Sequence, residues 1–151
     1  MSAIPPRSDV PEKQTWYAEL VFATREDWRK ELALVDAELG SLSDFPGTLS
    51  KSAKRLAEWI HVDQALSRRV EKLTFYAFMA SAVDSGDAEA VAMSGQVQSL
   101  DARFAAKTAF AEPELLGMDE TVLREWFSTE DSLNPYQHYV SNILRLKPHF
   151  I

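Results

Sequence analysis

The chain has no cysteine among its 151 residues. Disulfide bonds, thiolate zinc sites and thiol nucleophiles are therefore excluded. Histidine is scarce as well, since only His61, His138 and His149 are present. The five glycines are too few for a phosphate-binding loop, which needs several glycines close together so that backbone N–H groups can approach the phosphate.

Basic residues are outnumbered by acidic ones, because 16 Lys and Arg stand against 23 Asp and Glu for a formal charge of −7. This balance argues against a nucleic-acid surface or an anionic membrane as partner. No apolar run approaches the roughly 18 residues of a membrane-spanning helix, and the N-terminus has no apolar segment typical of a secretory signal. We therefore expect a cytoplasmic protein with no nucleic-acid or membrane partner.

Length and proline placement predict how the chain is organised. A chain of 151 residues suits one domain. Residues 1–22 contain Pro5, Pro6 and Pro11 and, because proline lacks the N–H that helices and sheets use, they are predicted to form an extended arm. The arm is expected to pack on the body through an apolar cluster: Trp16, Tyr17, Leu20, Val21 and Phe22. Residues 23–151 are expected to form the helical domain.

Apolar residues of the body recur at helical spacing, and no segment alternates in the manner of a strand. The predicted helices run from Thr24 to the turn at 45–47, from Ser50 to about Ala82, from Asp87 to about Phe110, from Asp119 to Phe127, and from Tyr136 to about Lys147. Pro113 is expected to break the third helix, Asn134-Pro135 to start the last one, and Pro148 to stop it. The predicted inner face of the third helix includes Val91, Val97, Leu100 and Phe104. The fold class is all-α, an irregular bundle of about five or six helices with an extended, proline-containing N-terminal arm.

The common catalytic motifs are absent. The sequence contains no H-E-x-x-H, G-x-S-x-G, G-x-G-x-x-G or G-x-x-x-x-G-K-[ST]. Glu58 and His61 have the Glu-x-x-His spacing of di-iron bundles, but such a site needs a second copy, and neither His138 nor His149 follows a glutamate by three residues. His61 is interpreted as a surface or helix-kink residue, and no catalytic, cofactor-binding or metal residue is assigned.

Basic side chains gather in the second predicted helix, and they have two interpretations. They are Lys51, Lys54, Arg55, Arg68, Arg69 and Lys72. They could bind an acidic partner or phosphate, or they could form a solvated face paired with Glu58 and Glu71 at helical spacings. The solvated face is favoured because the surrounding charge is negative.

Aromatic residues gather near the C-terminal end of the chain. They are Trp126, Phe127, Tyr136 and Tyr139. At helical spacing such residues belong in a core, whereas an exposed patch of them would indicate an interface.

Several segments resemble the oligoendopeptidase F family, the thimet-oligopeptidase-like zinc metallopeptidases, and they occur in the family's order. The segments are Arg7-Ser8-Asp9-Val10-Pro11 followed by Trp16, Phe45-Pro46-Gly47-Thr48-Leu49, and Leu66-Ser67-Arg68-Arg69-Val70-Glu71-Lys72-Leu73 with Tyr76-Ala77. The most specific match is Tyr136-Gln137-His138-Tyr139 followed by Ile143-Leu144-Arg145-Leu146-Lys147-Pro148-His149. In that family this string closes the N-terminal helical domain, which the chain resembles over nearly its whole length.

The resemblance implies that the parent enzyme is a zinc metalloendopeptidase that hydrolyses short peptides. In the family a downstream domain carries H-E-x-x-H and a further glutamate as zinc ligands, with the motif's glutamate as general base. None of those residues matches a position here, and the chain stops within a motif that the family continues. The resemblance therefore implies an enzyme part that is inactive alone, holds no cofactor and forms one wall of the substrate cleft.

The implied partners are the enzyme's own catalytic domain and short peptides, together with a second copy bound through the surface that the catalytic domain would cover. The alternative is a stand-alone helical protein-interaction or dimerisation module without catalysis. The C-terminal aromatic residues motivate that alternative.

Overall fold

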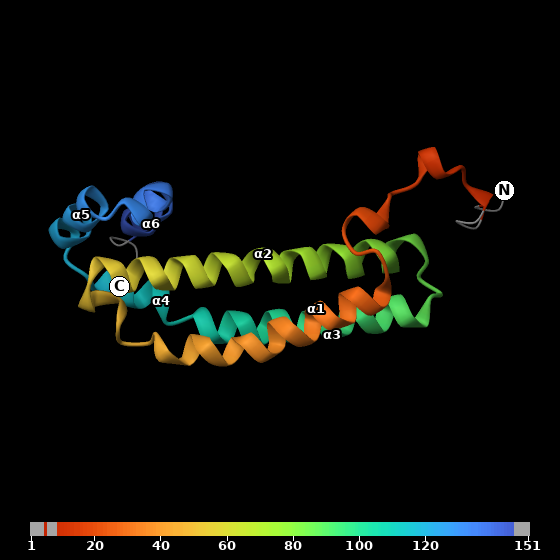
Figure 1. The fold of residues 1–151 in the computed structure, drawn as a ribbon, viewed down its shortest axis with the longest axis horizontal. Helices are drawn as coiled ribbons and strands as arrows, with labels where there is room; N and C mark the ends of the chain where they lie inside the picture. The colour runs from red at the N-terminus through yellow and green to blue at the C-terminus, as the bar shows by residue number, and fades with distance from the viewer. Residues whose placement is uncertain (1–4, 6–8, 147–151) are drawn as a thin grey trace. The chain divides into compact units, whose positions relative to one another are not determined.

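The structure, a computed structural model, describes residue 5 and residues 9–146. Helices account for the regular structure of these residues, and no strand occurs among them. The α-helices are α1 (Arg25–Glu38), α2 (Ala53–Val83), α3 (Ala88–Thr108), α4 (Ala111–Gly117), α5 (Glu120–Thr129) and α6 (Gln137–Leu146) (Figure 1). The predicted all-α class is confirmed, and none of the described helices has the length and apolar character needed to cross a membrane.

The chain divides into two compact units, and α2 contributes to both. The first unit takes the residues up to Ala37 and Ser67–Arg103, and the second takes Glu38–Leu66 and the residues from Phe104 onward. Each unit is described on its own below.

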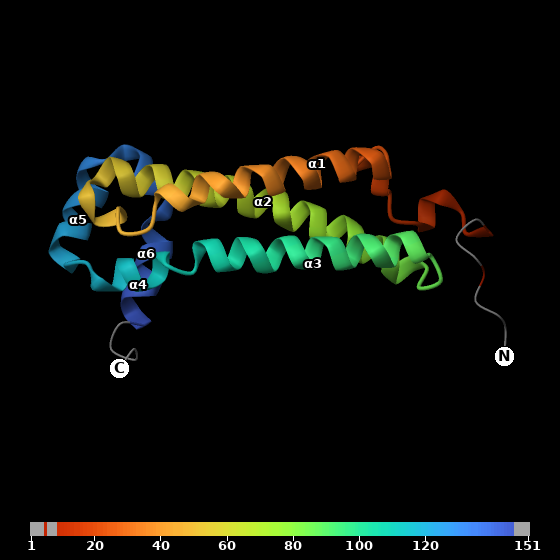
Figure 2. The same ribbon diagram turned by 90° about the horizontal axis from the view of Figure 1, so that it is seen from below.

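In the first unit, α1 and α3 run beside the C-terminal half of α2 (Figures 1 and 2). Trp28 of α1 is fully buried, and its indole Nε1 donates a hydrogen bond of 2.9 Å to the Leu73 carbonyl of α2. On the other side, the Ser94 hydroxyl of α3 donates to the Ala77 carbonyl at 3.1 Å. The apolar core around these contacts includes Val35, Val70, Leu73, Ala77, Ala90, Met93, Val97 and Leu100. Burial of each large side chain contributes about 1.5–3 kcal/mol, so apolar packing is the main stabilising term in this unit.

Thr24 and Asp87, from which the first and third helices were predicted to run, cap those helices in the first unit. The Asp27 amide donates to the Thr24 hydroxyl oxygen at 3.1 Å before α1. The amides of Glu89 and Ala90 both donate to one carboxylate oxygen of Asp87 at 3.1 Å before α3. Asp87 also forms an ion pair with Arg25, which joins the start of α1 to the start of α3.

The predicted inner face of α3 is wrong at one position. Val91 is 50% exposed, whereas Ala90 and Met93 are buried. The buried positions 90, 93, 97, 100 and 104 follow the alternating spacing of three and four residues that one helix face requires. Val91 lies one residue outside that series, and its apolar side chain therefore faces away from the core.

The arm before α1 contains two 3-10 turns, Glu12–Gln14 and Ala18–Leu20. Between them the Trp16 ring lies edge-on to Phe75, with centroids 5.6 Å apart, and to Tyr76 at 5.9 Å. Pro5 and Pro11 are exposed, and Pro6 lies outside the described residues. The division of the chain at residue 22 stays a prediction.

The second unit is built around the turn that precedes α2. In this turn Gly47 has a φ of 72°, in the left-handed region that favours glycine. The Glu114 carboxylate of α4 accepts hydrogen bonds from the amides of Gly47 at 2.9 Å and Leu49 at 2.6 Å. The rings of Phe45, Trp59 and Phe110 stack edge-on in series, at 5.3 and 4.7 Å between centroids.

Two prolines of the second unit lie inside helices. Helix α3 ends at Thr108, close to the predicted end at about Phe110, and Pro113 lies at the third residue of a further helix, α4, where an N–H would have no intrahelical partner. Asn134-Pro135 was expected to start the last α-helix, but Pro135 lies inside the 3-10 helix Asp131–Tyr136, and α6 begins at Gln137. Pro148 and His149 lie outside the described residues.

Substitution of glycine by alanine should have opposite effects at Gly47, in the turn, and at Gly95, inside α3. Gly47→Ala should lower the free energy of unfolding by about 1 kcal/mol, because an L-residue is strained at this φ even though no heavy atom lies within 4 Å of the added Cβ. Gly95→Ala, in the middle of α3 and equally uncrowded, should raise it by about 0.5–1 kcal/mol. Denaturant unfolding of both variants measures the difference. A Gly47→Ala variant as stable as Gly95→Ala would contradict the left-handed turn.

Candidate functional site

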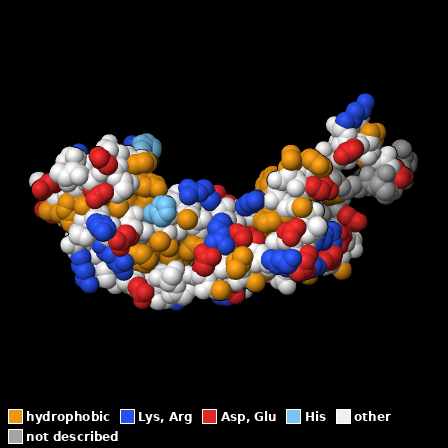
Figure 3. Space-filling model, viewed as in Figure 1, with side chains coloured by type: hydrophobic (Ala, Val, Ile, Leu, Met, Phe, Trp, Pro, Cys, Tyr) orange, Lys and Arg blue, Asp and Glu red, His pale blue; other side chains and the backbone are white. Residues whose placement is uncertain are grey.

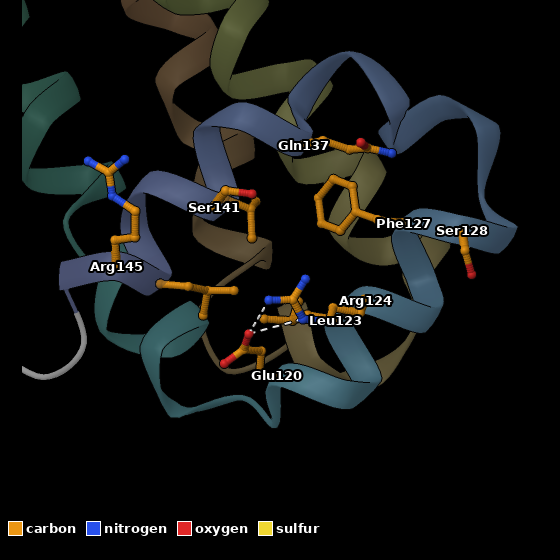
Figure 4. A pocket seen from close by; sticks show the side chains of 10 residues that line it. Glu120, Leu123, Arg124, Phe127, Ser128, Gln137, Ser141 and Arg145 are labelled. Atoms are coloured by element: carbon orange, nitrogen blue, oxygen red, sulfur yellow. Dashed lines mark hydrogen bonds and ion pairs between the residues drawn. The ribbon is translucent and has the colours of Figure 1, made fainter.

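A groove of about 490 Å³ lies between α5 and α6 in the second unit (Figure 4). Its volume is within the range of pockets that hold small ligands. The residues that line it are Glu120, Leu123, Arg124, Phe127, Ser128, Gln137, Val140, Ser141, Leu144 and Arg145.

The apolar floor of the groove comes from two pairs of residues at four-residue spacing. Leu123 and Phe127 lie one turn apart on α5, and Val140 and Leu144 lie one turn apart on α6. Leu123, Phe127 and Val140 are 8% exposed or less, and Leu144 is half-buried. The floor is therefore packed and pre-formed, with little apolar surface left in water.

The start of α5 is fixed by a helix cap. Asp119 caps it, with its carboxylate accepting from the amides of Thr121 at 2.7 Å and Val122 at 3.3 Å. Glu130 plays the same part for the 3-10 helix that follows, because its carboxylate accepts from the Ser132 amide at 3.3 Å. Hydrogen bonds from Ser132 lower the pKa of Glu130, so this cap stays ionised at neutral pH.

The polar rim of the groove contains two arginines, of which one forms an ion pair with a described residue and the other does not. Arg124 is neutralised by Glu120, with its Nε donating to the Glu120 carboxylate at 3.0 Å (Figure 4). Arg145 is exposed, and no described residue forms an ion pair or hydrogen bond with its guanidinium. The Ser141 hydroxyl, one helical turn before Arg145, also has no hydrogen-bond partner among residues 9–146. Among the residues that the structure describes, the rim therefore offers a cation and a hydroxyl without partners on the same face of α6.

Two titratable groups of the second unit, on α2 and α6, have raised pKa values. Burial raises the pKa of Asp63, and a hydrogen bond from Gln64 partly opposes that rise. Burial also raises the pKa of the Tyr139 phenol, and the negative charges of Asp63 and Glu112 add to the effect. Tyr139 is therefore a hydrogen-bond donor at neutral pH and not a nucleophile.

Glu58 and His61, the pair with the di-iron spacing, are both exposed. Glu58 forms an ion pair with Arg55, with 3.2 Å between a carboxylate oxygen and a guanidinium nitrogen. Within the part of the chain that the structure describes, no three His, Asp or Glu side chains gather where they could hold a metal ion. His138 lies beside Asn142, with 3.0 Å between their side-chain nitrogens.

The basic residues of the second predicted helix do not form one free patch. Arg55 pairs with Glu58 as predicted, donates to the Asp44 carbonyl at 2.6 Å, and lies 4.0 Å above the Phe45 ring. In the first unit, Arg69 pairs with Glu31 of α1 at 2.5 Å. The predicted pairing with the other glutamate, at position 71, is not seen among the described residues. Two of the arginines are thus held by contacts within their own unit.

The C-terminal aromatic residues are mostly packed. Phe127 is buried in the groove floor, Trp126 and Tyr136 are half-buried, and only Tyr139 is exposed, at 42%. The sequence pattern pointed to Phe127 but did not predict the groove or its rim. The groove could have been predicted from the four-residue spacing of apolar residues on both α5 and α6, because this spacing indicates apolar stripes that can face each other.

A second, shallower depression of about 780 Å³ lies in the first unit. Apolar side chains on its border are unusually exposed: Leu20 at 79%, Phe78 at 62% and Phe75 at 51%. Figure 3 shows hydrophobic side chains gathered at the surface beside the N-terminal arm. Its border charges balance, since Arg68 and Lys72 stand against Glu71 and Asp101.

The family model that matches the chain is described as Oligopeptidase F, and it covers residues 114–151. This match includes α5, α6 and the groove between them. Among curated relatives, oligopeptidase PepF of Bacillus subtilis is 30% identical over 98% of this chain and 22% of its own length. Group B oligopeptidase PepB of Streptococcus agalactiae is 32% identical over 96% of this chain and 24% of its own length.

Two solved structures share the fold. The crystal structure of oligoendopeptidase-F from Enterococcus faecium matches with a TM-score of 0.78 and 22% identity, covering 85% of this chain and 25% of that one. A putative peptidase from Chlamydophila abortus matches with a TM-score of 0.83 and 22% identity, covering 99% of this chain and 25% of that one. The chain thus spans about a quarter of the length of the proteins it matches.

Because burial raises the pKa of Asp63, replacing this residue by asparagine should stabilise the protein at neutral pH but not in acid. The folded pKa lies above the unfolded one, so the stability linked to Asp63 is complete below the unfolded pKa and is lost as pH rises through the folded pKa. Asp63→Asn should therefore raise the free energy of unfolding at pH 7 and have little effect below about pH 4, the ordinary carboxyl range. Denaturant unfolding at both pH values measures this.

Asp87→Asn is the matched control, because asparagine keeps the helix cap and removes only the charge. The hydrogen bond from Arg25 lowers the pKa of Asp87, so its stabilisation is present above the unfolded pKa and lost as pH falls through the folded one. This variant should be less stable at pH 7. If both substitutions act in the same direction at pH 7, the assigned environment of Asp63 is wrong.

Proposed function

We propose that the chain is the N-terminal helical domain of a cytoplasmic zinc metalloendopeptidase of the oligoendopeptidase F family that hydrolyses short peptides. The observation that carries this proposal is the span of the similarity, 96–98% of the chain against relatives named oligopeptidases. The fold agrees with two peptidase structures over 85% and 99% of the chain.

The chemistry of the proposed enzyme belongs to residues outside this chain. Peptide hydrolysis by zinc needs three protein ligands and an open position for water. This sequence has no H-E-x-x-H, and its three histidines are far apart along the chain. The residues of this chain therefore do not fit the zinc site, and no catalytic step is assigned to any of them.

The role proposed for the domain is to form one wall of the substrate cleft. The hydrogen bonds from Glu114, the helix caps and the apolar cores hold its helices in fixed positions within each unit. A wall of this kind excludes folded proteins and admits short flexible chains. The partners proposed are the catalytic domain and short peptides.

The second candidate function is a helical interaction or dimerisation module without catalysis. Exposed Leu20, Phe75 and Phe78 favour it, because large apolar side chains gathered on one surface commonly mark an interface. The same surface would serve a homo-oligomer of the parent enzyme.

The first proposal predicts that the isolated 151-residue chain is inactive and insensitive to zinc. A quenched fluorescent peptide should remain uncleaved with and without zinc, and saturating zinc should leave the melting temperature unchanged, since no cluster of possible metal ligands occurs among the described residues. The product of the complete reading frame should cleave the same peptide and lose this activity with a chelator.

A zinc-induced rise of several degrees in the melting temperature, or cleavage by the isolated chain, would overturn the assignment of the chemistry to residues outside it. If the complete reading frame yields no peptidase and the chain forms a dimer that Phe78→Ser dissociates in light scattering, the module is the better description.

A further inference from the structure

We propose that the groove between α5 and α6 binds the C-terminal end of a short peptide, with an aliphatic last side chain on the apolar floor and its carboxylate held by Arg145 and Ser141. The proposal rests on the proposed function, because it takes the parent enzyme to act on short peptides. It assigns a ligand-binding role to a domain for which the sequence predicts no catalytic residue.

The net charge of the groove rim suits an anionic ligand. The chain has a formal charge of −7, yet the groove rim carries two arginines and one glutamate. The pair of Arg124 with Glu120 cancels one positive charge. Arg145 supplies the remaining charge, and no carboxylate of the described residues lies within ion-pair distance of it. A site with this residual charge favours a ligand with one negative charge.

Two hydrogen-bond donors of α6 are spaced to bind one carboxylate. Ser141 and Arg145 both line the groove and lie four residues apart on α6, so their Cβ atoms are about 6 Å apart on one helix face. Figure 4 shows them one turn apart along the α6 side of the groove. A planar guanidinium binds both oxygens of a carboxylate, and a hydroxyl one turn away supplies a further donor. The other serine of the rim is not available, because Ser128 donates to the Glu125 carbonyl at 2.7 Å.

The floor of the groove is small and suits the end of a peptide better than a helix. A docked helix would need a broad exposed apolar stripe, but Leu123 and Val140 are only 1% and 3% exposed. A groove of about 490 Å³ over such a floor suits one or two residues of an extended peptide. A C-terminal residue is favoured because its side chain and carboxylate share one Cα, so both can reach the floor and the rim together.

The test is NMR titration of ¹⁵N-labelled full chain with three peptides: Ac-Ala-Ala-Leu with a free carboxylate, the same peptide amidated, and Ac-Ala-Ala-Gly with a free carboxylate. The first should shift α5 and α6 resonances in a saturable way. Loss of the carboxylate or of the leucine side chain should each weaken binding about tenfold. Added salt should weaken binding of the first peptide, because the charge pair is exposed.

Three variants localise the site. Arg145→Gln should weaken binding of the acid peptide about tenfold and abolish the preference over the amide, and Ser141→Ala should weaken it severalfold. The double variant Glu120→Gln with Arg124→Gln is the matched control on the same rim, because it removes an ion pair without changing the net charge of the rim, and it should change affinity less than twofold. Circular dichroism checks that each variant keeps its helices.

Equal binding of acid and amide peptides, absence of saturable shifts on α5 and α6, or an Arg145→Gln variant that binds normally would each overturn the proposal. The proposed function has a separate readout in peptide cleavage by the product of the complete reading frame. A product that cleaves peptides while the chain shows no carboxylate preference refutes only the groove assignment. Carboxylate-dependent binding without any peptidase refutes only the enzyme assignment.

Discussion

Burial of the apolar side of α2 is the constraint on which both units depend. Leu56, Trp59 and Ile60 are buried in the second unit, and Val70, Leu73 and Ala77 are buried in the first. No proline or glycine interrupts these 31 residues, so the helix presents its apolar side continuously. The other long helices are amphipathic and cannot be stable alone in water, so each needs this surface or one like it.

The polar and charged side chains of the described residues lie at the surface or are only half-buried. No charged or polar side chain is buried in the described part of the chain, and no buried side-chain nitrogen or oxygen there lacks a partner. Buried and perturbed titratable groups are common in catalytic sites, and here Asp63 and Tyr139 are only partly shielded from water. A domain of this kind contributes shape and binding surfaces, which agrees with a cleft wall and with a groove that holds a peptide end.

Local signals in the sequence predicted the fold well. Thr24, Asp87 and Asp119 cap helices because an N-cap side chain needs only the next three residues to act. Val91 was misplaced because one apolar residue beside a stripe can be assigned to it, and only packing decides which is buried. Helix α4 was missed, and Pro135 was assigned to the start of α6, because proline is compatible with the first turn of an α-helix and with a 3-10 helix, and sequence alone does not distinguish these positions.

The groove could not be predicted in the same way. Its floor depends on how α5 and α6 lie against each other, and the character of its rim depends on which arginine finds a partner. Arg124 meets Glu120 at a spacing of four residues, a pairing the sequence allows. That Arg145 has no described partner is a property of the fold, since carboxylates are abundant in the chain.

The proposed function makes these helices the non-catalytic part of a peptidase and requires that the catalytic part depends on them. Peptide cleavage by the product of the complete reading frame, measured before and after deletion of residues 1–151, tests it most directly. The account predicts that the intact product cleaves short peptides and that the deletion removes this activity. An unchanged rate after the deletion, or an intact product without peptidase activity, would contradict it.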